Sequence, residues 1–438
     1  MSWKNIYNER LTTAEEAVSR IKSGDRIAAP NAAGEAKHII RALVENKEAY
    51  LDVEVCQMLP IDGAIYTKPG LERHFRHVSL FVGGMSRETI KAGHGDYTPC
   101  HFSQIPNLWE RTLPLNAAII HVSLPDKHGF CSCGVAVDYS IHSAANARKN
   151  GGFVIAQVNE YMPRTLGDSF VHVSHMDCIV EHNEPITELA PHVITDVELE
   201  IGKNCAGLIN DGDCLQLGIG SIPDAVLISL KGKKRLGVHS EMFSDGVVEL
   251  VETGVIDNSA KNFQKGKMLA TFLMGTRRLY DFVHDNPMVF MAPATYTNDP
   301  LVAGQNDNLV SVNSAIQIDL LGQVCADMIG ATQYSAVGGQ ADFVRAAAIS
   351  KGGRSIIAMP STASGGKISK IVPFLDHGAA VTTSRNDVEY VITEYGVANL
   401  RYHTVRDRAA SLIRIAHPNF RDQLWDAFEQ RFNVKAKR

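Results

Sequence analysis

The sequence lacks the segments that direct a chain into a membrane or out of the cell. It has no apolar run long enough to cross a bilayer, and its first ten residues, MSWKNIYNER, are polar where a signal peptide has an apolar core. Its eight cysteines are scattered without a compact disulfide framework. We therefore expect a cytoplasmic protein in a reducing compartment, with no membrane partner.

A large excess of charge of one sign is also lacking. The formal net charge is -5 and the pI is near 6.4, so no long-range attraction draws the chain to nucleic acid or to an anionic membrane. We expect small molecules as partners, or a second copy of the chain.

Several signatures of cofactor and metal chemistry are missing. Pro223 stands where the dinucleotide fingerprint needs its third glycine, which argues against a nicotinamide cofactor. Cys131 and Cys133 form CxC rather than CxxC, and the His, Asp and Cys residues within 172–178 match no zinc spacing. There is no GxSxG motif. We expect no metal and no tightly bound cofactor.

Two parts of the chain repeat one order of elements. Thr13 with Glu16, and Thr195 with Glu198, are capping-box patterns that begin helices. Each helix leads to a Gly-Asp pair, and the aspartates at 25 and 213 are 188 residues apart. A strand, a glycine-bearing turn, a helix and a second strand follow in both parts. Further buried strands are expected later, at 289–292, 309–318, 355–359, 379–382 and 390–393.

The length and the repeat together predict the fold class. A chain of 438 residues exceeds the size at which single cores stop growing, so two domains are expected. We interpret the repeat as a diverged internal duplication that gives two similar, open, mainly parallel α/β domains. The polar connector around Pro185 and Pro191 places the domains at 1–185 and 190–438.

Only the second copy ends its last strand with an acid. Residues 236–239 alternate as a short strand, and a helix with Ser244 as a natural N-cap follows, so Glu241 falls at the sheet edge where ligands bind. The first copy has Gln57-Met58 at the matching place. A solvated surface charge is the alternative for Glu241. We interpret Glu241 as a covalent nucleophile.

Two glycine turns could serve the same chemistry. Gly218-Ile219-Gly220, between a strand and a helix, could hold an anion with its amides or be a tight structural turn. Gly338-Gly339, before a predicted helix at 343–348, exposes N–H groups that suit an oxyanion, and a plain capped turn is again the alternative. Gln216 is expected to be buried, where its amide needs a partner, and a catalytic donor is one role that satisfies it.

Glu241, the stretch from Gln216 to Gly220 and the run Gly338-Gly339-Gln340-Ala341-Asp342-Phe343 together resemble the acetyl-CoA hydrolase/transferase family of class I CoA-transferases. Pro125-Asp126 through Gly129, Gly134-Val135 to Asp138 and Phe243-Ser244-Asp245-Gly246 extend the resemblance over nearly the whole chain. Within the family, the 4-hydroxybutyrate and butyrate:acetate CoA-transferases are the most similar. The resemblance implies two α/β domains of the NagB/RpiA/CoA-transferase type with the active site between them. It also implies a homodimer or a larger homo-oligomer.

The resemblance also assigns residues. It implies that Glu241 becomes a glutamyl-CoA thioester, and that Gln216 and the Gly338-Gly339 amides stabilise oxyanions. It makes Met58 a candidate for the acyl pocket, with a plain core methionine as the alternative, and makes Asn31 a substrate-binding candidate that stands where some relatives carry histidine. The residues that it assigns to coenzyme A binding are Gly218, Ile219, Gly220, Ser221, Ile222, Ile316, Gly338, Gly339 and Gln340.

We therefore expect a CoA-transferase that moves CoA, as a substrate, between a short-chain acyl-CoA (4-hydroxybutyryl-, butyryl- or acetyl-CoA) and a carboxylic acid such as acetate. A glutamate is ionised at neutral pH and needs no general base for this role. A short-chain acyl-CoA hydrolase on the same frame is the first alternative. A sugar-phosphate isomerase or a non-catalytic ligand-binding module is the second.

Overall fold

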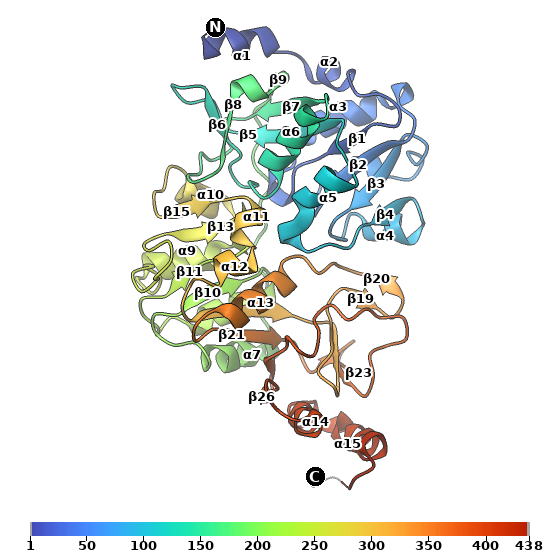
Figure 1. Cartoon of the computed structure of the whole chain (residues 1–438), viewed down its shortest axis with the longest axis vertical. Helices are drawn as coiled ribbons and strands as arrows, with labels where there is room; N and C mark the ends of the chain where they lie inside the picture. The colour runs from blue at the N-terminus through green and yellow to red at the C-terminus, as the bar shows by residue number, and fades with distance from the viewer. Residues whose placement is uncertain (1, 436–438) are drawn as a thin grey trace. The chain divides into compact units, whose positions relative to one another are not determined.

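The computed structural model describes residues 2–435, which pack into two compact units (Figure 1). The first unit contains the residues up to Ala190 together with Leu269–Thr297. The second contains Pro191–Met268 and the residues from Asn298 onward. The contiguous ranges 1–185 and 190–438 do not include this return of Leu269–Thr297 to the first unit.

A seven-stranded sheet forms the centre of the first unit, in the order β4-β3-β2-β1-β5-β7-β9 with every neighbouring pair parallel. Strand β5 is buried along its whole length, as expected for a parallel strand covered on both faces. The strands are β1 (Arg26–Ala28), β2 (Val53–Gln57), β3 (Phe75–Ser79), β4 (Gly95–Tyr97), β5 (Ala117–Val122), β7 (Phe153–Val158) and β9 (Cys178–Glu181).

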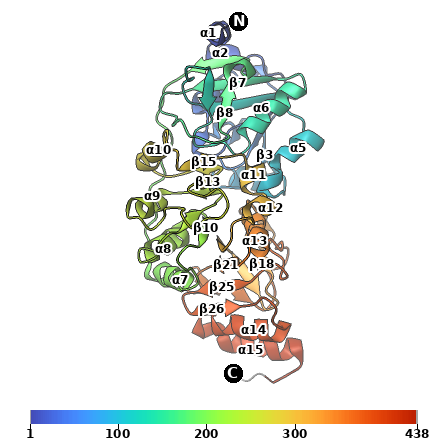
Figure 2. The same ribbon diagram turned by 60° about the vertical axis from the view of Figure 1, so that its left-hand side comes forward.

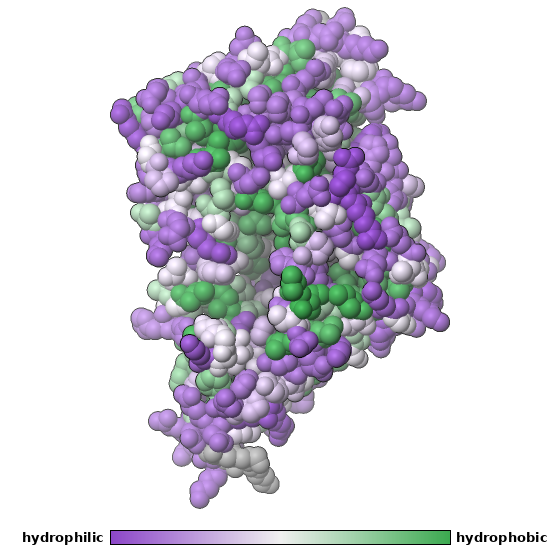
Figure 3. Space-filling model, turned by 180° about the vertical axis from the view of Figure 1, so that it is seen from behind, coloured by the Kyte–Doolittle hydropathy of each residue, from purple (hydrophilic) through white to green (hydrophobic). Residues whose placement is uncertain are grey.

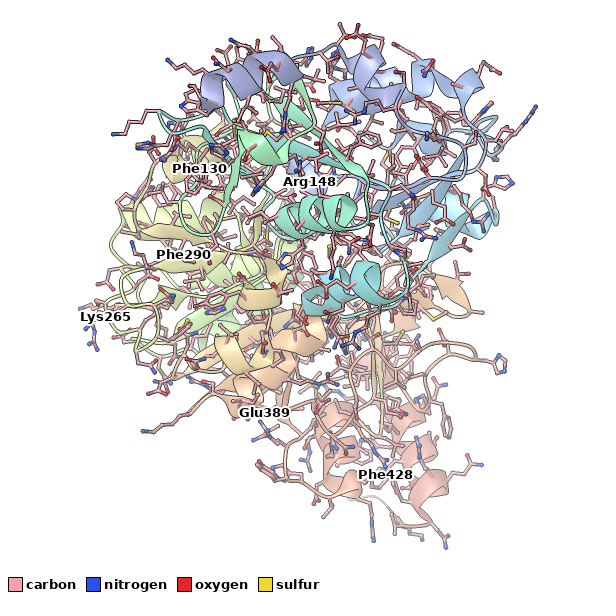
Figure 4. The ribbon with its side chains drawn as sticks, turned by 45° about the horizontal axis from the view of Figure 1, so that its top comes forward. Phe130, Arg148, Lys265, Phe290, Glu389 and Phe428 are labelled. Atoms are coloured by element: carbon pink, nitrogen blue, oxygen red, sulfur yellow. The ribbon has the colours of Figure 1, made fainter. Side chains whose placement is uncertain are left out.

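Helices cover both faces of this sheet. One face packs against α2 and α3 in a core that includes Ile27, Val55 and Ile119. The other face packs against α6, on which Figure 4 labels Arg148. The helices of this unit are α1 (Trp3–Arg10), α2 (Ala14–Val18), α3 (Lys37–Glu45), α4 (Arg87–Lys91), α5 (Ile105–Arg111), α6 (Ser140–Lys149), α10 (Arg277–Val283) and α11 (Ala294–Thr297). The short strands are β6 (Phe130–Ser132), β8 (Phe170–His172), β13 (Met268–Ala270), β14 (Phe272–Leu273) and β15 (Val289–Met291).

The second unit repeats the arrangement with six strands in the order β11-β10-β16-β21-β25-β26, parallel except for the β25-β26 pair. Figure 2 shows α7 and α8 on one side of this sheet and α12 and α13 on the other. The strands are β10 (Cys214–Leu217), β11 (Gly237–Val238), β16 (Leu309–Ser314), β21 (Arg354–Ala358), β25 (Tyr390–Thr393) and β26 (Gly396–Asn399). The helices are α7 (Asp196–Ala206), α8 (Ser221–Ser229), α9 (Asp245–Glu252), α12 (Pro300–Ala303), α13 (Gln340–Ile349), α14 (Val405–Arg414) and α15 (Pro418–Phe432).

The C-terminal helices close the core of the second unit. Trp425 and Phe428 of α15, the latter labelled in Figure 4, lie edge to face with ring centroids 5.3 Å apart and pack with Leu412 and Ile413 of α14. The remaining short strands are β12 (Met242–Phe243), β17 (Gln317–Asp319), β18 (Val324–Cys325), β19 (Met328–Ile329), β20 (Thr332–Gln333), β22 (Thr362–Ala363), β23 (Ile368–Ser369) and β24 (Ile371–Val372).

The predicted fold class, two open and mainly parallel α/β arrangements, is confirmed. Both capping boxes form, since Thr13 and Thr195 accept from the backbone of Glu16 and Glu198 and each glutamate bonds back. The predicted strand at 379–382 is wrong. There Thr383 makes an isolated bridge to Val324, so the apolar residues before it join no sheet.

The surface mixes polar and apolar side chains. Figure 3 shows apolar patches separated by hydrophilic residues on the face seen from behind. Among residues 2–435, no helix combines the length and the low polarity needed to cross a bilayer.

Candidate functional site

Glu241 lies just after β11 and before the short strand β12. Its neighbours Ser240 and Met242 are buried and line a small cavity shared with Leu227 of α8. Glu241 itself lies in a bend between β11 and β12 and is half-buried. Its Oε2 accepts a hydrogen bond of 2.8 Å from Asn298 Nδ2.

The first turn of α13 lies against this carboxylate. Gly339 is the N-cap of the helix, and a Cβ atom at this position would collide with Glu241 Oε2 and Asn298 Nδ2. Only glycine therefore allows the backbone to approach so closely. The N-terminal end of the helix dipole favours a negative charge here, on Glu241 or on an oxyanion formed beside it. Gly338, with φ +51°, adopts the left-handed conformation that starts this turn.

Gln216 lies on the strand next to Glu241. The β10–β11 register pairs Leu215 with Val238, which puts Gln216 beside His239, two residues before Glu241 in the chain. The Gln216 side chain is 2% exposed, and its Oε1 accepts a hydrogen bond of 3.0 Å from Asn313 Nδ2. The prediction that this amide is buried is confirmed.

The turn from Gly218 to Ile222 follows β10 and starts α8. Gly220 has φ 118° and ψ 176°, a backbone conformation open essentially only to glycine. Ile219 at the tip is 37% exposed, while Ile222 returns to the core. The Ser221 hydroxyl donates to Glu198, the capping-box residue of α7. The turn is thus fixed at its base and presents its backbone at the carboxyl end of the strand.

Ile316 and Gln340 lie beyond the same sheet edge. Ile316 follows β16, is half-buried, and donates its backbone N–H to Cys325. Gln340, at the start of α13, donates through Nε2 to Thr383 Oγ1 at 3.1 Å. Because β10 and β16 run parallel, the residues that follow them share one edge. The structure therefore brings the second-unit candidates to one edge of one sheet.

In the first unit, Asn31 and Met58 follow the neighbouring strands β1 and β2. Both are buried, with exposed fractions of 0% and 2%. Asn31 Nδ2 donates to Asp138 at 2.7 Å and its Oδ1 accepts from the Leu59 backbone N–H, so the Asn31 amide is held on both sides. Burial raises the pKa of Asp138 to about 7.

Asn298 is a candidate that the sequence did not indicate. It is fully buried, 57 residues from Glu241 in the chain, and its Oδ1 has no partner among the described residues. Buried polar atoms without a hydrogen-bond partner are rare in folded proteins. A role of Asn298 beside a reacting carboxylate would explain this one. Among residues 2–435, no three His, Cys, Asp or Glu side chains are grouped to hold a metal ion.

Comparison with protein families gives two matches. Residues 1–191 match the model described as the acetyl-CoA hydrolase/transferase N-terminal domain, and residues 275–428 match the corresponding C-terminal domain.

Individual proteins match over the full length. The 4-hydroxybutyrate coenzyme A transferase of Clostridium kluyveri is 55% identical over 433 residues, 99% of this chain and 100% of its own. The butyryl-CoA:acetate CoA-transferase of Anaerostipes caccae is 38% identical, with 97% of each chain covered. The crystal structure of 4-hydroxybutyrate CoA-transferase from Porphyromonas gingivalis is 40% identical, with a TM-score of 0.85 over 98% of this chain and 100% of that one.

Proposed function

Because the chain belongs to the acetyl-CoA hydrolase/transferase family, we propose that it is a CoA-transferase acting on short-chain acyl-CoA esters and carboxylic acids. The donors would be 4-hydroxybutyryl-, butyryl- or acetyl-CoA, and the acceptor an acid such as acetate. The observation that carries the proposal is the Glu241 carboxylate, bonded to Asn298 and packed against Gly339 at the start of α13. An isomerase or a simple binding module would give this carboxylate no such role.

The reaction proceeds in two halves through Glu241. A carboxylate oxygen of Glu241 attacks the thioester carbonyl, and CoA thiolate leaves to give a mixed anhydride. The thiolate then attacks the Glu241 carbonyl carbon, the acyl acid leaves, and a glutamyl-CoA thioester remains. The incoming acid reverses these steps and departs as the new acyl-CoA. The thioester bond energy is conserved because water never attacks.

Each attack creates a tetrahedral oxyanion that needs donors already in place. The Gln216 amide and the Gly339 backbone N–H are the proposed donors. Removal of one preorganised donor costs roughly 3 to 4 kcal/mol of transition-state stabilisation in comparable sites. The closeness of Gly339 to Glu241 and the burial of Gln216 support this assignment.

Coenzyme A is a substrate in this scheme, and no tightly bound cofactor is proposed. The backbone of the turn Gly218 to Ile222, which is most exposed at Ile219 and also includes Gly220 and Ser221, suits its phosphates and pantetheine amides. Ile316, Gly338 and Gln340 would bind further parts of the molecule.

For the acyl end, we keep Met58 and Asn31 as candidate pocket residues. The flexible thioether of Met58 suits an adaptable apolar wall. The fixed Asn31 amide would act on the pocket through its shape rather than by turning to bond each substrate.

Protein mass after incubation with acyl-CoA tests the covalent step. The wild-type protein should gain the mass of CoA on the peptide that contains Glu241, and acetate should remove it. Glu241→Gln should show no adduct and no exchange while its circular dichroism spectrum stays unchanged. An adduct on the Glu241→Gln variant would refute the assignment.

A short-chain acyl-CoA hydrolase is the alternative function, because the two reactions differ only in whether water reaches the glutamyl thioester. CoA release measured with and without acetate separates them. A transferase should release little CoA alone and exchange rapidly with acetate. Release at the full rate without any acid would favour the hydrolase.

We further propose a cytoplasmic homo-oligomer. None of the eight cysteines forms a disulfide within residues 2–435, which suits a reducing compartment. The homo-oligomer is what the family resemblance implies. Light scattering should give at least twice the 47.8 kDa of one chain.

A further inference from the structure

Asn313 has no part in the steps described above, yet its side chain is bonded to a proposed catalytic donor. It lies on β16, the neighbour of β10 on the side away from β11. Its Nδ2 donates to Gln216 Oε1 at 3.0 Å and to Ser311 Oγ at 2.8 Å. Ser311 is the register partner of Gln216. Asn313 therefore lies on the adjacent strand, two residues nearer the carboxyl ends of the strands.

This bond determines which end of the Gln216 carboxamide faces which neighbour. A carboxamide has an acceptor oxygen at one end and a donor NH2 group at the other. The NH2 group of Asn313 meets the oxygen end. If the Gln216 amide alone turned over, two NH2 groups would face each other and the bond would be lost. The Asn313 amide is held by its second bond, from Nδ2 to Ser311 Oγ.

The strand order then directs the N–H groups of Gln216 away from Asn313. Gln216 lies on β10, between Asn313 on β16 and Glu241 just after β11. A turned-over amide would present its oxygen to the developing oxyanion, and the two negative ends would repel. Correct orientation is therefore a condition for any role of Gln216 as a donor.

We propose that Asn313 is a positioning residue, which locks the Gln216 carboxamide with its N–H groups toward the reaction centre at Glu241. The inference rests on the proposed function and deepens it. Asn313 touches neither substrate nor oxyanion in this role. It lowers the barrier because the donor needs no reorientation when the charge develops.

Two substitutions of Asn313 give different expectations. Asn313→Leu keeps the size but removes the bond, so the Gln216 amide can take either orientation, and kcat should fall roughly tenfold. Asn313→Asp offers only acceptors and would draw the NH2 end of Gln216 toward itself, so kcat should fall roughly 100-fold, the range for loss of a donor. The KM for acyl-CoA should stay within about twofold of wild type for both, because neither change removes a proposed CoA contact.

The decisive measurement is a double-mutant cycle with Gln216→Ala. Once Gln216 is absent, Asn313→Leu and Asn313→Asp should cost nothing further, because Asn313 acts only through that amide. If the aspartate acted merely by adding negative charge, its effect would persist in the Gln216→Ala background. Ser311→Ala removes the other bond of the Asn313 NH2 group, which lets the Asn313 amide turn over, so it should lower kcat in the wild-type background and cost nothing further in the Gln216→Ala background.

Several results would overturn the inference. They are unchanged kcat in both Asn313 variants, unchanged kcat in Gln216→Ala, and full additivity in the cycle. Melting curves show whether each variant is folded. An Asn313 variant that fails to fold is replaced in the cycle by Asn313→Ser. Wild-type protein that forms no CoA adduct at Glu241 would refute the proposed function and this inference together. A wild-type adduct with additive variants would refute the inference alone.

Discussion

Gly339 is the position at which one added methyl group should lower the catalytic rate and leave the fold intact. A methyl group there would meet Glu241 Oε2 and Asn298 Nδ2, and one of these groups must move. We predict that Gly339→Ala lowers kcat roughly tenfold or more, since small displacements of reacting groups have large costs. Steady-state exchange between butyryl-CoA and acetate is the measurement.

The matched control for this change is Gly232→Ala. Gly232 has no heavy atom within 4 Å of an added Cβ and needs no positive φ, so its variant should keep full activity. The two variants should melt within a few degrees of wild type. Equal activity in Gly339→Ala and Gly232→Ala would show that the contact with Glu241 has no catalytic importance.

Sequence reasoning could identify some residues of this site and not others. Glu241 and Gly339 stand out locally, since one follows a strand end and the other lies in a glycine pair before a helix. Asn298 does not stand out, because an asparagine before Asp-Pro is typical of a helix start and its contact with Glu241 spans 57 residues. The orientation of Gln216 depends on Asn313 of another strand, which no local pattern shows.

Among the elements, α7 is connected to the turn proposed to bind CoA. Glu198 closes the capping box with Thr195 and also accepts from the Ser221 hydroxyl. We predict that Glu198→Ala raises the KM for acyl-CoA about fivefold, equivalent to about 1 kcal/mol, because the turn loses its bond to α7. The kcat with saturating acyl-CoA should change little, because Glu241 and its donors stay in place.

The first unit offers a control for this prediction. Glu16 closes the same capping box with Thr13 at the start of α2, and its side-chain bonds stay within residues 12–16. Glu16→Ala should lower the stability slightly, because the capping box is lost, with no change in KM. Equal KM values in the Glu198→Ala and Glu16→Ala variants would show that the Ser221 bond does not shape the CoA turn.

A buried acid, Glu35, holds the loop that follows β2. Glu35 accepts from the backbone N–H groups of Ile61, Asp62 and Gly63 and from Gln57 Nε2. Burial is the main cause that raises the pKa of Glu35 from 4.5 to about 8, and the neighbouring Asp62 adds to it. Between these two pH values the folded protein holds a proton that the unfolded chain has released.

The stability that Glu35 contributes is therefore complete below about pH 4.5 and falls as the pH rises through 8. We predict that the free energy of unfolding of the wild type declines over this window, with a Glu35 contribution of up to about 1.4 kcal/mol per pH unit. Glu35→Gln cannot ionise, so its decline should be shallower even if its overall stability is lower. Urea titrations at pH 5.5, 7 and 8.5 give both slopes, and parallel slopes would contradict the raised pKa.

For the whole molecule, the sequence predicted the architecture better than the path of the chain. Alternation of buried strands and helices is a local property, so two mainly parallel sheets followed from it. The return of Leu269–Thr297 to the first unit depends on contacts between segments far apart in the sequence, and nothing local indicates it. The strand expected at 379–382 failed for a related reason, because an apolar run forms a strand only where a neighbour can pair with it.

The residues proposed to bind CoA are spread over several turns of the second unit. The turn from Gly218 to Ile222 and Ile316 would bind parts of CoA remote from the reacting thioester, while the start of α13 lies against Glu241. Binding energy from remote parts of a substrate can be used to orient and desolvate the reacting end. Butyryl-pantetheine and butyryl-N-acetylcysteamine should therefore show lower kcat than butyryl-CoA, as well as higher KM, with acetate as acceptor. The control is the rate at which each of the three thioesters reacts with free hydroxylamine, which should be equal.

Equal kcat values for all three substrates would mean that the remote contacts only hold the substrate. The nucleotide end of CoA would then have no part in activating Glu241.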